Sequence, residues 1–329
     1  MLNAAIVGLG RWGRKLVDSV QIGGAPEGAA IRFTRAVART PAAAEDYARG
    51  QGLALSGDFA DALADPDIGG VVLATPHDQH VGQIEAASAA GKHVFVEKPL
   101  ALTRAGAERA AAAARRAGVV LALGHNRRFL SSMRELKRLA AAGELGTIVH
   151  AEGNFTGTFG FDYRPGMWRA EERGASGAMS AMGIHVVDGL IHLVGPVDAV
   201  RCTAIRRAIA VDMADAVSLH LEFACGASGF LSTLLASPRF RRFQLFGTRG
   251  WAQMRGHHKL DICAADAAVE TRTFDDGDGL REELEAFAAA AAGGPAYPLP
   301  LPEAVHGIAV FEAALQSAAA DGARISVTP

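Results

Sequence analysis

The feature that most constrains the fold is a glycine-rich turn between an apolar segment and an amphipathic one. A strand, such a turn and a helix, in this order, are typical of the first unit of a doubly wound parallel sheet. Gly8 permits a tight turn, Gly10 leaves room for a phosphate group near the backbone, and Gly13 lets the helix pack closely on the strand. An ordinary strand–helix turn could carry the same glycines, so the segments that follow decide the interpretation. The full run is Gly8-Leu9-Gly10-Arg11-Trp12-Gly13.

Strand-like and helix-like segments continue to alternate through the first 124 residues. Repeated units of this kind indicate a parallel sheet with right-handed crossovers, whose ligands bind at the carboxyl ends of the strands. Several chemically distinctive residues follow such strand ends, which strengthens the prediction of a binding site there. The expected strands are 4–7, 31–37, 70–74, 93–96 and 119–123, and the expected helices are 14–20, 81–90 and 104–117.

The end of the second expected strand distinguishes between two nicotinamide cofactors. Enzymes that use NAD carry an acidic residue there, which holds the ribose 2′-hydroxyl. Here Arg39 and Thr40 follow the strand, and no carboxylate occurs at that point. A guanidinium and a hydroxyl suit a 2′-phosphate, so the sequence favours NADP(H) over NAD(H). The alternative is that Arg39 is solvated and either cofactor binds.

The motifs of the first half together resemble the glucose–fructose oxidoreductase/inositol dehydrogenase/MocA family, and the resemblance extends along essentially the whole chain. Glu-Lys-Pro at a strand end is the hallmark of that family. The matching pieces are the glycine turn, Thr75 to His80, Gly91 to Val94, Glu97-Lys98-Pro99 and Gly124 to Phe129.

The resemblance implies roles for these residues. Lys98 would act near the nicotinamide and the reacting carbon, and Glu97 would help to hold the cofactor. Thr75, Pro76 and His77 would lie near its ribose and ring, although many relatives have Asn at position 77. His80 belongs to the same cofactor-binding set, with a structural role as the favoured alternative. The resemblance also suggests a cis Lys98-Pro99 bond.

The second half predicts a sheet-rich domain. Apolar and polar residues alternate from Val217 to Phe223, the period of a strand with one buried face. Turn-linked strands suggest an α+β domain with a large, open and mainly antiparallel sheet. We therefore expect a dinucleotide-binding domain over residues 1–124 and a substrate-binding and oligomerisation domain over 125–329. Further expected strands are 148–158, 199–206, 228–235, 240–246 and 260–264, with a hairpin turn at 247–250 and helices at 280–292 and 303–320.

One apolar helix, expected from residue 177 to 192, carries a polar stripe of His185, Asp188 and His192. These side chains either satisfy one another in the core or serve a function. The resemblance favours function for His185, as a catalytic residue, and leaves Asp188 as a substrate residue or core partner. Relatives carry an acid where this chain has Ala181. Either Lys98 and His185 suffice, or another acid replaces it, or the protein has lost catalysis.

A segment upstream of that helix resembles the family's substrate-side loop. Its candidate substrate residues are Asp162, Tyr163, Trp168 and Arg169. Asp162 could supply the carboxylate missing at position 181. Trp168 and Arg169 match a Trp-Arg pair of the family and either line the pocket or pack.

These observations predict hydride transfer between a nicotinamide and a sugar, polyol, inositol or related cyclic alcohol or ketone. Lys98 would take the hydroxyl proton, which requires that its ammonium first lose one; burial and the positively charged nicotinamide favour that loss. His185 would orient the substrate hydroxyl. The alternatives are a cofactor-binding sensor or regulator without turnover, and a reductase of an imine, enone or dihydrodiol-type substrate.

Composition excludes several other classes. The net charge is −2 and the basic clusters are short, so nucleic-acid binding is not expected. No apolar run reaches the ~20 residues of a membrane-spanning helix. Three widely spaced cysteines indicate reduced thiols in a cytoplasmic protein, and no ligand set for a metal accompanies the histidine pairs. The resemblance suggests a homodimer or homotetramer.

Overall fold

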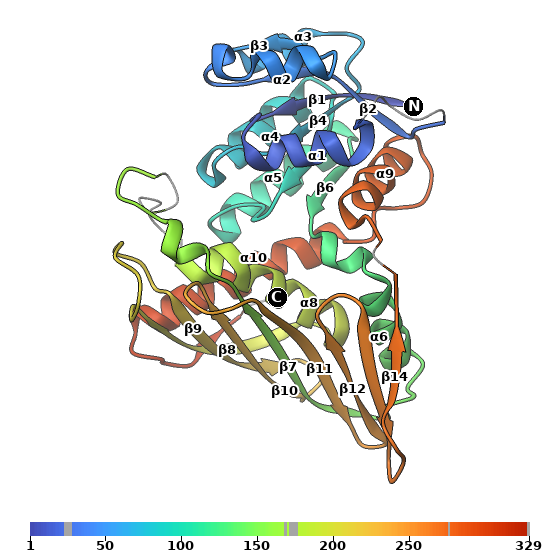
Figure 1. Cartoon of the computed structure of the whole chain (residues 1–329), viewed down its shortest axis with the longest axis vertical. Helices are drawn as coiled ribbons and strands as arrows, with labels where there is room; N and C mark the ends of the chain where they lie inside the picture. Colours follow the sequence, from blue (N-terminus) through green and yellow to red (C-terminus); the bar gives the residue numbers. More distant parts are fainter. Residues whose placement is uncertain (23–27, 168–169, 171–176, 276, 328–329) are drawn as a thin grey trace. The chain divides into compact units, whose positions relative to one another are not determined.

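The structure is a computed structural model that describes residues 1–22, 28–167, 170, 177–275 and 277–327 of the chain. It divides into two compact units (Figure 1). The first unit comprises residues 1–126 and 278–305, and the second comprises residues 127–277 and 306–329. No helix among the described residues is long and apolar enough to cross a membrane.

The first unit is built on a six-stranded sheet in the order β3-β2-β1-β4-β5-β6, in which every neighbouring pair is parallel. This is the doubly wound order with a switch point between β1 and β4. The strands β1, β4 and β5 are almost entirely buried, as expected where helices cover both faces. The strands are β1 (Leu2–Val7), β2 (Ile31–Val37), β3 (Ala54–Ser56), β4 (Gly70–Leu73), β5 (His93–Glu97) and β6 (Leu121–Gly124).

Two pairs of helices cover this sheet. Helix α4 packs on α5 and β5, whereas α1 packs on α9. Helix α5 begins at an N-cap, Thr103, whose side chain accepts the Gly106 N–H, and ends at the left-handed Gly118. The helices are α1 (Arg11–Gln21), α2 (Glu45–Gly50), α3 (Phe59–Ala64), α4 (His80–Ala89), α5 (Arg104–Ala117) and α9 (Gly279–Ala291), with short 3₁₀ turns η1 (Pro41–Ala43) and η2 (His77–Gln79).

The return of residues 278–305 to the first unit corrects the domain boundary expected from the sequence, which assigned them to the second domain. Phe287 of α9 lies against Phe95 of β5, with ring centroids 5.9 Å apart. Tyr297 lies edge-on to the Phe95 ring, and its hydroxyl group donates a hydrogen bond to the Leu123 carbonyl oxygen. Burial of these aromatic rings holds the late segment on the early sheet.

The second unit is built on a nine-stranded sheet in the order β14-β13-β12-β11-β7-β10-β9-β8-β15. All neighbours are antiparallel except β7 and β10, so the mainly antiparallel sheet expected from the sequence is confirmed. The strands are β7 (Ile148–Thr156), β8 (Val197–Ile205), β9 (Ala216–Phe223), β10 (Ser228–Leu234), β11 (Phe240–Gly247), β12 (Gly250–Arg255), β13 (Lys259–Ala264), β14 (Glu270–Thr273) and β15 (Ile325–Ser326).

Helix α8 (Ile184–Val194) lies on β7 and β11 at two glycine positions. A Cβ at Gly153 would come within 2.2 Å of Val186, and one at Gly189 within 2.5 Å of the Phe243 ring. The glycines therefore allow this helix to approach the sheet closely. A π-helical turn, η5 (Met179–Gly183), precedes α8. Other helical segments are η3 (Asn126–Phe129), α6 (Ser131–Ala141), η4 (Phe159–Asp162) and α10 (Leu301–Ala319).

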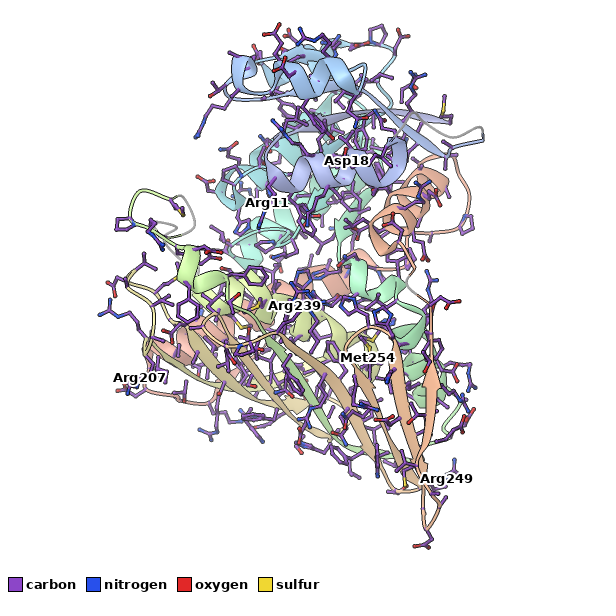
Figure 2. The ribbon with its side chains drawn as sticks, in the orientation of Figure 1. Arg11, Asp18, Arg207, Arg239, Arg249 and Met254 are labelled. Atoms are coloured by element: carbon purple, nitrogen blue, oxygen red, sulfur yellow. The ribbon has the colours of Figure 1, made fainter. Side chains whose placement is uncertain are left out.

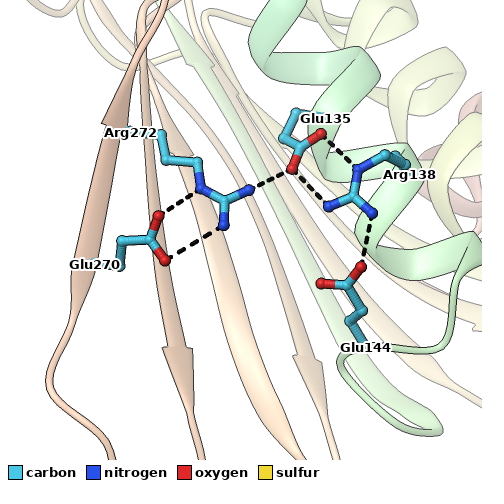
Figure 3. A network of polar contacts seen from close by, with 5 residues as sticks. All are labelled: Glu135, Arg138, Glu144, Glu270 and Arg272. Carbon is cyan, nitrogen blue, oxygen red and sulfur yellow. Dashed lines mark hydrogen bonds and ion pairs between the residues drawn. The ribbon is translucent and has the colours of Figure 1, made fainter.

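An ion-pair network ties α6 to the edge strand β14 (Figure 3). Arg272 of β14 donates to Glu135 of α6 and to its strand neighbour Glu270. Arg138 donates to Glu135 and to Glu144. The network places charged side chains on the edge strand β14, which discourages its pairing with another chain.

Candidate active site

The glycine turn has the geometry that a bound dinucleotide requires. Gly8 has φ of +96°, and a Cβ there would lie 2.6 Å from the Ala74 carbonyl oxygen. A Cβ at Gly13 would lie 2.1 Å from the Gly8 carbonyl oxygen, whereas one at Gly10 would meet no atom of the described residues within 4 Å. Helix α1 starts after Gly10 with no side-chain cap and no acidic residue in its first turn. Its N-terminal N–H groups therefore suit a pyrophosphate, and the residues present fit a nicotinamide dinucleotide.

The structure brings the Glu-Lys-Pro segment to this turn. The Trp12 indole Nε1 donates to Glu97 Oε1 at 2.5 Å, and the Lys98 backbone N–H donates to Glu97 Oε2 at 3.2 Å. Glu97 is buried, whereas Lys98 is half-buried. The acid thus links α1 to the end of β5 and sets the backbone from which the Lys98 side chain extends. Arg11, which precedes Trp12, is exposed.

The Thr75-Pro76-His77 segment follows β4 and adjoins the same turn through Ala74. Thr75 Oγ1 donates to Gln83 Oε1 at 2.6 Å. His80 is fully buried, with Nδ1 at 2.8 Å from the Pro99 carbonyl oxygen and Nε2 at 3.1 Å from that of Thr75. It therefore holds two candidate loops together, which supports its structural role. His77 is also buried, and its ring lies edge-on to that of His80.

The Lys98-Pro99 peptide bond is cis, as the resemblance suggested. Arg39 and Thr40 are exposed beyond the end of β2. Their side chains are accessible to a ligand that reaches this strand end.

A buried carboxyl group that was not predicted from the sequence lies beside Glu97. Glu283 of α9 is 1% exposed, and its Oε2 has no hydrogen-bond partner among the described residues. Burial, with the negative charges of Glu97 and Asp278, raises the pKa of Glu283 well above its usual value. The available signal was its position one helical turn before Phe287, on the apolar face of α9.

In the second unit, helix α8 carries the expected stripe of His185, Asp188 and His192, and Arg128 contacts the last two of these residues. Arg128 Nε and Nη2 donate to the Asp188 carboxylate at 2.8–3.1 Å, and Nη1 lies 3.2 Å from His192 Nδ1. Burial and the Arg128 cation lower the pKa of His192 to about 4. These contacts support the core-partner interpretation of Asp188 and His192.

His185 lies at the other end of the stripe, half-buried and next to Phe155 of β7, with ring centroids 6.2 Å apart. Arg127 and Arg241 lie over the Phe155 ring, with Cζ atoms 4.2 Å and 4.8 Å from its centroid. This cluster was not predicted from the sequence, although Arg127 belongs to a matched motif. Ala181 falls in the π-helical turn η5, so the period of a regular α-helix does not relate its position to that of His185.

The substrate-side loop is described in part. Asp162 ends η4 and is exposed, and Tyr163, which follows it, is half-buried. Trp168 and Arg169 lie outside the described residues. Among the residues that are described, no group of three or more His, Cys, Asp or Glu side chains is arranged to hold a metal ion.

Comparisons with known proteins agree with this architecture. The chain is 29% identical to the rhizopine catabolism protein MocA of Rhizobium meliloti over 94% of its length and 93% of the relative. It is 32% identical to the scyllo-inositol 2-dehydrogenase (NADP⁺) IolW of Bacillus subtilis over 48% of its length and 44% of the relative. The match to the oxidoreductase YdgJ of Escherichia coli, at 31% identity, spans 56% of this chain and about half (53%) of that relative.

Among solved structures, levoglucosan dehydrogenase in complex with NADH and levoglucosan superposes with a TM-score of 0.89 at 24% identity, covering 100% of both chains. The two family models match different halves of the chain. An oxidoreductase family model with an NAD-binding Rossmann fold matches residues 2–125, and the model of the GFO/IDH/MocA C-terminal domain matches residues 133–253. The chain therefore belongs to the GFO/IDH/MocA family of NAD(P)-binding oxidoreductases.

Proposed function

We propose that the protein is an NADP-dependent dehydrogenase that transfers hydride between the nicotinamide and a carbon bearing a hydroxyl group in a sugar, polyol, inositol or related cyclic alcohol. The observation that carries the proposal is the position of Lys98. Its backbone N–H binds Glu97, which is itself held by Trp12 of the glycine turn. The lysine is thus attached to the edge of the sheet where a dinucleotide would bind.

Lys98 is the proposed proton-transferring group. As a neutral amine, Lys98 Nζ would accept the proton of the substrate hydroxyl, and in the reverse direction the ammonium would return it to the alkoxide oxygen. The bound dinucleotide would supply the hydride acceptor or donor. His185 is the proposed second catalytic group, which would hydrogen-bond the same substrate oxygen.

Two observations support NADP(H). The end of β2 carries exposed Arg39 and Thr40 where NAD enzymes place an acid. The relative IolW is named as NADP⁺-dependent, although the solved levoglucosan dehydrogenase is complexed with NADH. A 2′-phosphate at this point would pair with the guanidinium.

Binding and turnover test these assignments separately. Thermal-shift titration with NADP, NADPH, NAD and NADH should give the largest shifts with NADP(H), and Arg39→Ala should reduce NADP affinity about tenfold or more while NAD affinity changes little. Arg49→Ala is the matched control, because Arg49 is also exposed and lies in α2, the helix that follows this strand end. Equal affinity of the parent for NAD and NADP would remove the cofactor preference from the proposal.

A sugar, polyol and inositol screen with the preferred cofactor then tests catalysis. Lys98→Met should abolish turnover while leaving cofactor binding in place, and His185→Ala should lower kcat more than cofactor affinity. Undiminished turnover by Lys98→Met would exclude Lys98 as the proton-transferring group.

A second candidate is a sensor that binds the cofactor without turnover. Ala181 supports it, because the resemblance implies an acid at this position. Such a protein would bind NADP(H) yet transfer no hydride with any compound of the screen. Reduction of a dihydrodiol-type, imine or enone substrate is a further alternative, and mouse trans-1,2-dihydrobenzene-1,2-diol dehydrogenase is 28% identical over 60% of this chain. Including such compounds in the screen separates the three possibilities.

A further inference from the structure

We propose that the second unit contains a recognition site for an anionic group, a carboxylate or phosphate, on the substrate. The site is formed by Arg127 and Arg241 around Phe155, beside His185. The inference rests on the proposed function and adds the charge class of the substrate to it.

Strand register and side-chain alternation place Arg241 on the face that carries α8, and Arg127, in η3, lies over the Phe155 ring of the same face. Arg241 of β11 pairs directly with Phe155 of β7, and Phe243 with Gly153. Gly153 is the position where α8 approaches the sheet. The next residue along β11, Arg242, has the opposite orientation and donates to Glu152 and Asn154. Adjacent arginines on one strand therefore have different surroundings.

Each arginine of the cluster has one buried N–H group for which the described residues provide no acceptor. Arg127 Nη1 and Arg241 Nε are buried and have no hydrogen-bond partner among the described residues. Arg241 uses Nη1 to contact His257 Nε2 at 2.6 Å. In the part of the chain that the structure describes, neither guanidinium forms an ion pair with a carboxylate. Buried N–H groups without acceptors are costly, and a ligand that accepts them would be favoured.

The neighbouring carboxylates Asp188 and Glu152 are paired with other arginines. Both oxygens of Asp188 accept from Arg128, and Glu152 pairs with Arg242 on the other face of the sheet. Exposed Arg239, labelled in Figure 2, immediately precedes β11 and adds a third cation near Arg241. The cluster thus has an excess of positive charge.

The electrostatics agree with the geometry. Burial, together with the Arg241 cation, lowers the pKa of Arg127 to about 9, which still leaves it charged near neutrality. Burial and the Arg239 cation lower the pKa of Arg241. A bound anion would relieve this repulsion and accept charge-assisted hydrogen bonds in the fork geometry that guanidinium offers. Because Phe155 contacts both the arginines and His185, the anionic group would lie next to the proposed catalytic histidine.

The test measures binding to the NADP-saturated full-length protein by calorimetry. The probes share a ring and differ in whether it carries an anionic group: glucose, glucuronate and glucose 6-phosphate, and myo-inositol with its monophosphate. We expect at least one anionic probe to bind ten times more tightly than its neutral counterpart, and the carboxylate and phosphate arms then identify the group. Arg127→Met and Arg241→Met should each weaken that binding tenfold or more, with less than threefold change for the neutral probe.

Arg242→Met is the matched control, because it removes a neighbouring arginine from the opposite face and should leave anion affinity unchanged. Arg241→Lys keeps the charge and the stacking but loses the fork, so it should retain intermediate affinity even if the Met variant folds poorly. Three results would overturn the proposal: no anionic probe binds, neutral probes bind as tightly, or the arginine variants lower NADP affinity instead.

Failure of this inference differs from failure of the proposed function. Turnover of neutral alcohols that is indifferent to Arg127 and Arg241 would overturn the anion site and leave the dehydrogenase standing. Arginine-dependent binding of an anionic probe without any hydride transfer would support the anion site and overturn the dehydrogenase.

Discussion

Single residues of the glycine turn have different neighbours and therefore different consequences when changed. A methyl group at Gly13 would lie 2.1 Å from a backbone oxygen, whereas one at Gly10 has no neighbour within 4 Å in the part of the chain that the structure describes. We expect Gly13→Ala to lower stability by about 1–3 kcal/mol, because backbone must shift. Gly10→Ala should keep the parental Tm but lose at least tenfold in dinucleotide affinity. Thermal melts and nucleotide titration measure both; parental affinity in Gly10→Ala would show that the phosphates do not approach this residue.

The role of Asp188 depends on its partner Arg128, and the sequence does not reveal that pairing. Its carboxylate neutralises Arg128, which is 5% exposed. Asp188→Asn would leave a buried cation with weaker acceptors, at a cost of about 3–5 kcal/mol of unfolding free energy. Chemical denaturation measures the loss, with Asp212→Asn, an exposed acid paired to exposed Arg206, as the control. If Asp188→Asn is as stable as the parent but fails to bind substrate, Asp188 is a substrate residue after all.

At the scale of elements, periodicity predicted most of the long segments, but the 11-residue α6 was missed together with several short or irregular elements. The bounds of β2 and α5 match the expected ranges, because an apolar run and a capped helix carry clear local signals. The three-residue β3 is too short to show a period, and the hairpin partner β12 was missed. The helix expected from residue 177 to 192 begins with the π-helical turn η5, which a period of 3.6 residues does not predict.

The same distinction applies to the candidate site. Motifs that lie within one segment, such as Glu97-Lys98-Pro99, could be read from the sequence. The contact of Arg241 with Phe155 depends on the register between β7 and β11, which are 90 residues apart in places and carry no local signal of their pairing. Glu283 was missed for a similar reason, because its neighbour Glu97 belongs to another part of the chain.

Helix α9 carries the buried Glu283, whose ionisation should make the stability of the folded protein depend on pH. The pKa of Glu283 is raised in the folded state above its usual value of about 4.5, so the folded protein holds a proton that the unfolded chain releases above that pH. The stability contributed by this group therefore declines as pH rises above about 4.5. Glu283→Gln removes the titration. Its Tm should equal that of the parent near pH 4 and exceed it at pH 7–8, in thermal melts across this range; Glu285→Gln, a half-buried neighbour, is the control.

At the scale of the whole molecule, the chain returns to its first unit at residues 278–305 and then re-enters the second unit, where it adds β15 to the sheet. The cut suggested by the sequence, after residue 124, would therefore separate the early sheet from α9 and Tyr297. Phe95, fully buried in the intact unit, would lose two aromatic neighbours. The organisation into domains is thus a property of packing and not of chain order, which is why the boundary could not be read from the switch in periodicity.

This organisation predicts the behaviour of two fragments. Residues 1–126 alone should melt without a cooperative transition or at a Tm at least 10 °C below that of the same segment joined by a flexible linker to residues 278–305, because the second fragment restores burial of Phe95 and Phe287. The linked fragment should also bind the dinucleotide, since the glycine turn, Thr75 and Glu97 all lie within it. Circular dichroism melts and nucleotide titration of both fragments measure this. Equal Tm and equal affinity would mean that α9 contributes nothing to the first unit, and that its packing on β5 is incidental.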